Sequence, residues 1–136
     1  MIRESKTQDL KAITEIYNDA ILNTTAVYTY LETTVEERTQ WMMKKQNEGW
    51  PLWVYEIEGN IAGFASYGTF RDWPAYQYTI EHSIYVSTQY RRKGVASKLL
   101  VRSTSFLSAW GTNLTKSFDG IITFLPDNPR KILVIT

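Results

Sequence analysis

An uninterrupted strand, basic turn and helix start between Tyr78 and Leu100 constrain the fold of this chain more than any other feature. A strand is expected first, because successive residues of a strand point to opposite faces and the side chains alternate in two sets: Tyr78, Ile80, His82, Ile84 and Val86, against Thr79, Glu81, Ser83 and Tyr85. The polar, basic segment Ser87–Lys93 follows, and Gly94 opens a helical pattern. A strand that leads into a helix through a short turn is typical of proteins built from helices packed on a sheet.

Two helices are predicted before this segment. The first follows Thr7, the expected N-cap, and carries an apolar stripe at helical spacing: Leu10, Ile13, Ile16, Tyr17 and Ala20. The second begins at Thr34, whose hydroxyl forms a capping box with Glu37, and runs to about Gln46. Gly49 is expected to end it.

A β-hairpin is predicted between the second helix and the long strand. Its strands are Leu52–Ile57 and Ile61–Tyr67, joined by a Glu-Gly-Asn turn. After Arg102 the pattern weakens, and only two short apolar runs are candidate strands: Ile121–Leu125 and Ile132–Ile135. The order of elements predicts one domain over residues 1–136, in the α/β (α+β) class, with a hairpin-built sheet flanked by helices.

Composition excludes several function classes. Fifteen Lys and Arg against fourteen Asp and Glu give a net charge of +1, so we expect no nucleic-acid partner and no membrane-surface partner. The chain has no Cys and a single His, His82, which excludes a Cys-based zinc site, a two-His metal site and a thiolate nucleophile. There is neither an N-terminal apolar region nor a membrane-length apolar run, so we expect a soluble, cytoplasmic protein.

The basic turn predicts an anion-binding site. Free N–H groups at a helix start and the helix dipole favour a negative ligand at this point. Gly94 and Ala96 permit close approach to the backbone, while Arg91, Arg92 and Lys93 add positive charge. The expected ligand is a phosphate or pyrophosphate. A solvated basic loop ended by a glycine is the alternative. A nucleotide-binding module is disfavoured, because the turn lacks the Gly-Lys-Ser/Thr pattern.

The pattern Arg91-x-x-Gly94-x-Ala96, placed between a strand and a helix, resembles the acyl-CoA pyrophosphate motif of the GNAT N-acetyltransferases. Four further segments resemble the phosphinothricin/methionine sulfoximine acetyltransferase branch of that family: residues 13–20, 63–68, 70–71 and 79–86. The resemblance covers residues 1–102. It implies the GNAT acyl-CoA N-acyltransferase fold, whose mixed sheet is mostly antiparallel, and an enzyme that acetylates the amine of a small amino acid or analogue.

The resemblance also implies that acetyl-CoA is the co-substrate and that no metal takes part. The expected acetyl-CoA site comprises Ile84, Tyr85, Val86, Arg91, Arg92, Lys93, Gly94, Val95, Ala96 and Ser97. A backbone N–H near Tyr85 or Val86 would polarise the thioester carbonyl. The partners implied are a small-molecule amine and a second copy in a homodimer.

Glu81 is the candidate general base. A carboxylate in a partly apolar pocket has a raised pKa suited to accept a proton from an ammonium group, and the resemblance implies this role for the Glu of the Glu-His-Ser motif. An ordinary exposed strand Glu is the alternative. His82 falls on the opposite face, with Ile80 and Ile84, and is expected to be a hydrogen-bonded structural residue.

Arg71 is the candidate ligand of the substrate carboxylate, because a guanidinium held among aromatic side chains suits bidentate capture of that group. Trp73 belongs to the same aromatic loop. Tyr28 and Tyr30, which follow the first helix, are candidate walls of the acceptor pocket. The alternative for Arg71 is a solvent-facing loop position with no role in binding. The alternative for Tyr28 and Tyr30 is packing in the protein interior.

Residues 103–136 depart from the family pattern and form a divergent tail, so the C-terminal part of the fold is expected to be incomplete. One hypothesis is a frameshift, since reading from the third base of the Ala109 codon forces a Gly where relatives have Gly-Tyr-x-Lys. Ordinary divergence is the other. With a truncated tail, we expect a weakened homodimer, and the alternative function is an inactive acyl-CoA-binding remnant.

Overall fold

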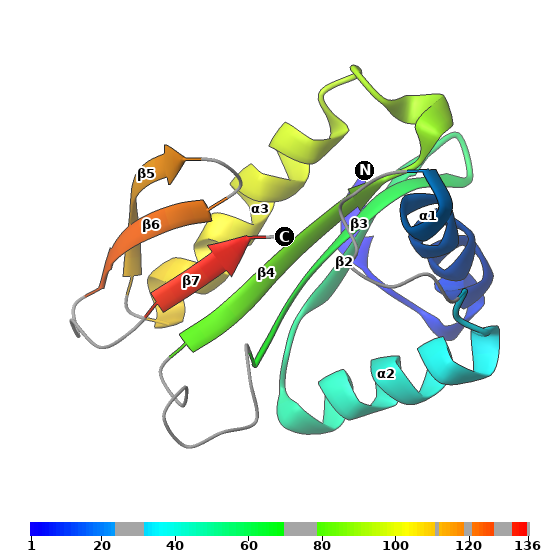
Figure 1. Ribbon diagram of the computed structural model, residues 1–136, viewed down its shortest axis with the longest axis horizontal. Helices are drawn as coiled ribbons and strands as arrows, with labels where there is room; N and C mark the ends of the chain where they lie inside the picture. The colour runs from blue at the N-terminus through cyan, green and yellow to red at the C-terminus, as the bar shows by residue number, and fades with distance from the viewer. Residues whose placement is uncertain (24–31, 70–78, 111, 119–120, 127–131, 136) are drawn as a thin grey trace.

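The computed structural model describes residues 1–23, 32–69, 79–110, 112–118, 121–126 and 132–135, with side chains for 1–20, 32–68 and 82–103. Its main sheet has the order β1-β2-β3-β4-β7 (Figure 1), and a separate two-stranded sheet pairs β5 with β6. The strands are β1 (Ile2–Glu4), β2 (Leu52–Ile57), β3 (Asn60–Thr69), β4 (Thr79–Val86), β5 (Thr112–Phe118), β6 (Ile121–Pro126) and β7 (Ile132–Ile135). The helices are α1 (Leu10–Asn23), α2 (Val35–Glu48) and α3 (Val95–Trp110).

Three of the four pairings in the main sheet are antiparallel, and β7 runs parallel to β4. The expected mixed, mostly antiparallel sheet with flanking helices is therefore confirmed. Strand β1 is an addition that the sequence did not predict, because a three-residue strand is too short to show a period. Among the described helices, none combines the length and the apolar character that crossing a bilayer requires.

Each face of the sheet has its own apolar core. The face under α1 and α2 buries Leu10, Ile13, Ile16, Met42, Leu52, Val54 and Phe64. The opposite face, under α3, buries Trp53, Ala62, Ala65, Tyr67, Val95 and Leu99. The stripe predicted for the first helix thus supplies core contacts, and the alternation of the strands decides which side chains meet which helix.

The second helix begins and ends as predicted. The Thr34 hydroxyl accepts a hydrogen bond from the N–H of Glu37 at 3.1 Å, and Gly49 ends the helix with a φ of 77°. The start of the first helix differs from the prediction, because Thr7 is not its cap but the first residue of a 3₁₀ turn. In this turn the Asp9 carboxylate accepts a hydrogen bond from the backbone N–H of Lys6 at 2.7 Å. The free amide at the start of the turn is therefore satisfied by an acidic side chain three residues after Lys6.

The C-terminal part has more regular structure than the sequence indicated. Helix α3 continues eight residues past Arg102 to Trp110, and β5 occupies Thr112–Phe118, where no period was found. The two candidate strands are present as β6 and β7. Ser103 shows why a Ser-rich stretch can stay helical: it is fully buried, and its hydroxyl donates to the carbonyl of Leu100 at 2.8 Å.

Candidate functional site

The basic turn between β4 and α3 has a backbone that leaves room for a ligand. Arg92 and Gly94 both have left-handed backbone angles, with φ of 62° and 77°. An arginine in this region costs about 1 kcal/mol or more, and such strain is concentrated at functional sites. The buried residues Val95 and Leu99 fix the first turn of α3 against the sheet, so the strained turn is held in place.

A pocket of about 250 Å³ lies at this turn and is lined by Val86, Tyr90, Arg91, Arg92, Gly94, Val95, Ala96 and Ser97. The structure therefore brings together seven of the ten expected acetyl-CoA residues. Of the other three, Lys93 lies beside the pocket with its ammonium 5.4 Å from the Tyr90 ring centre, while Ile84 and Tyr85 lie earlier on β4. Arg91 also reaches α1, where its guanidinium is 3.8 Å from the Asp19 carboxylate.

The outer edge of β4 presents backbone amides next to this pocket. The N–H of Ser87 donates to the carbonyl of Ala62 on β3 at 2.8 Å. Because backbone groups of successive strand residues point alternately to the two edges, the N–H groups of Val86 and Ile84 point away from β3. Strand β7 pairs with the first half of β4 only, ending at His82 (Figure 1), so no strand in the described part of the chain covers these two amides.

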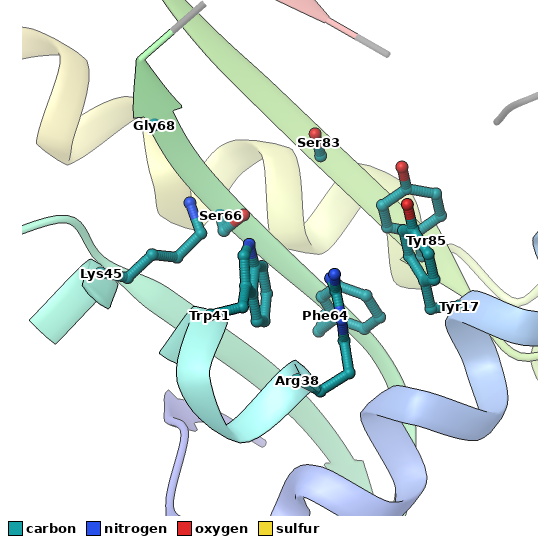
Figure 2. A pocket seen from close by; sticks show the side chains of 9 residues that line it. All are labelled: Tyr17, Arg38, Trp41, Lys45, Phe64, Ser66, Gly68, Ser83 and Tyr85. Atoms are coloured by element: carbon teal, nitrogen blue, oxygen red, sulfur yellow. The ribbon is translucent and has the colours of Figure 1, made fainter. Parts of the chain in front are cut away.

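A second pocket, of about 240 Å³, lies on the sheet face covered by α1 and α2 (Figure 2). Aromatic side chains form its walls, two cations enter it from α2, and small or hydroxyl residues of β3 and β4 form its floor. Its lining consists of Tyr17, Arg38, Trp41, Lys45, Phe64, Ser66, Gly68, Ser83 and Tyr85. The pocket combines apolar walls with fixed positive charge, an arrangement that suits a small ligand with an anionic or dipolar group.

The two cations of this pocket are held by well-defined contacts. The Arg38 guanidinium carbon lies 4.5 Å from the ring centre of Tyr17 and 4.8 Å from that of Trp41. The Lys45 ammonium donates to the Tyr67 carbonyl at 2.6 Å and is buried. Burial lowers the pKa of Arg38, although nearby Glu37 acts in the opposite direction. These residues were not predicted from the sequence. Their spacing indicated that they share a surface, since Arg38, Trp41 and Lys45 are positions i, i+3 and i+7 on one face of α2.

Glu81 occupies a strand position at the end of this second pocket. The register of β4 places it opposite Gly68, which lines the pocket, and beside Val134 of β7. The four expected substrate residues, Tyr28, Tyr30, Arg71 and Trp73, lie outside the described residues. The described residues contain no group of three or more His, Cys, Asp or Glu side chains placed to hold a metal ion.

His82 is fully buried on the opposite face of the sheet, as predicted, but it is not hydrogen-bonded as expected. Its ring stacks on that of Tyr67, with centroids 4.3 Å apart, and neither ring nitrogen has a hydrogen-bond partner among the described residues. Burial lowers the pKa of His82 to about 4. His82 is therefore a core residue whose ring face packs on Tyr67, and its burial favours the uncharged ring.

Comparison with known proteins gives consistent results. Residues 10–117 match the acetyltransferase (GNAT) family, which extends the likeness beyond Arg102. The chain is 40% identical over 101 residues to the L-methionine sulfoximine/L-methionine sulfone acetyltransferase of Salmonella typhimurium, a match that covers 74% of this chain and 59% of that protein. The chain thus spans less than two thirds of that relative's length.

Two solved structures are similar in both fold and sequence. An N-acetyltransferase from Staphylococcus aureus is 56% identical with a TM-score of 0.78, covering 82% of this chain and 67% of that one. A GNAT-superfamily phosphinothricin acetyltransferase from Sinorhizobium meliloti, solved in complex with acetyl-CoA, is 28% identical with a TM-score of 0.68. That match covers 85% of this chain and 76% of the other.

Proposed function

Because the chain belongs to the GNAT acetyltransferase family, we propose that it transfers the acetyl group of acetyl-CoA to the amine of a small amino acid or an analogue such as methionine sulfoximine or phosphinothricin. The similarity to enzymes named for these acceptors supports the acceptor class. The single observation that carries the proposal is the basic turn: a strained backbone with basic side chains at the start of a helix, next to amides of β4 that no strand in the described part of the chain covers.

The turn is the proposed binding site for the pyrophosphate of acetyl-CoA. The N–H groups at the start of α3 and the helix dipole favour a negative charge there, and Gly94 lets the phosphates approach the backbone. Arg91, Arg92 and Lys93 are exposed and add positive charge around the pocket. Ile84, Tyr85 and Val86 would lie along the remainder of the molecule, and the N–H of Val86 or Ile84 would donate to the thioester oxygen.

Glu81 is the proposed general base. Its carboxylate would remove a proton from the acceptor ammonium, directly or through a water molecule, because only the neutral amine is nucleophilic. The amine nitrogen then attacks the thioester carbonyl carbon, a C–N bond forms, the C–S bond breaks, and the departing thiolate takes up a proton. Arg71 is the proposed ligand of the acceptor carboxylate, with Tyr28, Tyr30 and Trp73 as walls of the acceptor site.

The test is release of free thiol from acetyl-CoA in the presence of methionine sulfoximine. We expect turnover by the unaltered chain and a loss on the order of 10²- to 10⁴-fold in Glu81→Gln. Glu58→Gln, which removes the same charge from the exposed hairpin turn, is the matched control and should retain full activity. Turnover that survives Glu81→Gln would remove the base assignment. Binding of coenzyme A without any thiol release would favour the alternative, an inactive acyl-CoA-binding remnant.

Assembly and cellular location are proposed on the family likeness. We propose a cytoplasmic protein that forms a homodimer, weaker if its C-terminal part is altered. Light scattering during gel filtration, over a range of protein concentrations, would test the dimer. The hypothesis of a frameshifted tail over residues 103–136 is tested by the nucleotide sequence of codons 100–136: an early stop in the shifted frame would contradict it.

A further inference from the structure

The pocket under α1 and α2 contains a cation that the proposed mechanism does not use. Arg38 is half-buried there, and its Nε has no hydrogen-bond partner among the described residues, where it also forms no salt bridge. Burying a charged group without an anionic partner is unfavourable, because the group loses water and gains no compensating hydrogen bond. An anionic group that binds the Arg38 guanidinium would offset this cost.

Aromatic rings hold the Arg38 guanidinium in a defined orientation. Tyr17 of α1 and Trp41 of α2 both lie within 5 Å of its central carbon, and Figure 2 shows the side chain extending between them above Phe64. Rings that cover the faces of a guanidinium leave its N–H edge available, and that edge is the part that binds oxygen anions in a bidentate manner. The side chain is thus prepared to bind an anion before the anion arrives.

The charged side chains that the structure describes in the lining of this pocket are both cations. Lys45 is the second cation on its wall, and the lining that the structure describes includes no Asp or Glu. The neutral polar groups, Ser66 and Ser83, lie on neighbouring strands at paired positions. A ligand with an acidic or strongly dipolar end would be favoured here over one with an apolar end, because only the former compensates the half-buried Arg38 guanidinium.

The pocket also has a direction. At one end is Gly68, the register partner of Glu81, and at the other end are Phe64 and Tyr85, which pair with each other four residues further along the strands. Arg38 lies at this second end in Figure 2. An acceptor whose amine is at the Glu81 position would extend its side chain along the pocket toward Arg38.

We propose that this pocket receives the side chain of the acceptor amino acid and that Arg38, assisted by Lys45, binds an anionic or dipolar oxygen group at the end of that side chain. This inference rests on the proposed function and keeps its acceptor class; it adds the residue that would recognise the oxygen-bearing end of the acceptor side chain. Arg38 is then a specificity-determining residue, separate from the ligand of the α-carboxylate.

The test compares acceptors that differ only at the end of the side chain. In Arg38→Met, a long unbranched side chain keeps contact with the aromatic rings but has no charge. We expect kcat/KM for phosphinothricin to fall on the order of 10- to 100-fold, as expected for loss of a charge-assisted hydrogen bond, while kcat/KM for norleucine, which has no terminal oxygen, stays unchanged. Lys44→Met removes the same charge from an exposed position on α2 and should alter neither value.

Equal losses for both acceptors would overturn the inference, since both share the α-carboxylate and the amine, and so would no loss for either. Direct binding of phosphinothricin to the protein, measured by calorimetry without acetyl-CoA, separates this inference from the proposed function. Binding that depends on Arg38 without turnover would support the pocket and contradict the enzyme. Turnover with unaltered selectivity in Arg38→Met would support the enzyme and contradict the pocket. Absence of phosphinothricin binding in the unaltered chain would contradict the pocket.

Discussion

The ring of His82 on β4 stacks on the ring of Tyr67 on β3, with an angle of 13° between the planes. The two residues are register partners, and both are fully buried. The Tyr67 hydroxyl donates to the carbonyl of Ser103 on α3 at 3.3 Å. This stack joins the central strands to α3. It also holds a titratable ring in an environment that favours its neutral form.

The stability of the fold should therefore fall in mild acid. The pKa of His82 is lowered from 6.5 to about 4 by burial, so between these values the unfolded chain binds a proton that the folded chain does not. Stability consequently rises with pH across this window, and we expect a loss of about 2 kcal/mol between about pH 7.5 and about pH 5. Urea unfolding at both pH values measures it.

His82→Phe is the matched variant, because it keeps an aromatic ring and removes no hydrogen bond found among the described residues. Its unfolding free energy should be nearly independent of pH in the same window. An unchanged pH dependence in this variant would show that other groups cause the acid sensitivity.

A side chain at Gly63 should destabilise the fold. A Cβ at this position would lie 2.8 Å from the carbonyl oxygen of Tyr85 and 3.2 Å from a methyl group of Val95, so the strand or the helix would have to move. We expect Gly63→Ala to lower the free energy of unfolding by about 1–3 kcal/mol. In Gly68→Ala the new Cβ would meet only the Lys45 ammonium at 2.9 Å, the end of a flexible side chain, so a smaller loss is expected. Equal losses in urea unfolding would contradict this difference.

Gly94 and Gly49 form a matched pair for testing the phosphate-binding turn. Both have a φ of 77°, and a Cβ at either would meet nothing within 4 Å. Gly94→Ala and Gly49→Ala should therefore lose similar stability, about 1–2 kcal/mol, from backbone strain alone. Only Gly94→Ala should weaken acetyl-CoA binding in calorimetry. An equal effect of the two substitutions on binding would argue against a site at the turn.

Asp9 should be important for stability although it lines neither of the two pockets described above. Burial raises the pKa of Asp9, but bidentate hydrogen bonds from Arg3 at 2.8 and 2.9 Å and the N–H of Lys6 outweigh this and lower it. Asp9→Asn removes the nearer of the two anionic partners of Arg3 and leaves only the longer contact to Glu56, so we expect a loss of about 2–4 kcal/mol in chemical unfolding. Glu56→Gln, which affects the longer 3.4 Å contact to Arg3, should cost less than about 1 kcal/mol. Similar losses would contradict the dominant role of Asp9.

Local signals in the sequence predicted the parts of the fold that short-range interactions determine. Thr34, Glu37 and Gly49 mark the ends of α2, because capping bonds join residues within one turn of a helix. The hairpin and the alternation of β4 were found for the same reason. The extension of α3 past Arg102 was missed, since its Ser-rich sequence has weak periodicity and is supported by contacts such as the burial of Ser103.

The sequence by itself determined the class of the protein, its helices and central strands, and the charged turn before α3, since each depends on residues close together in the chain. Only the tertiary structure decided which distant residues meet. Tyr17, Arg38 and Tyr85 come from α1, α2 and β4, and no spacing rule places them around one pocket. His82 likewise stacks on Tyr67, fifteen residues earlier, a contact that the alternation of its own strand does not indicate. Packing between residues far apart in the chain determines such contacts, and local patterns in the sequence do not reveal which residues will meet.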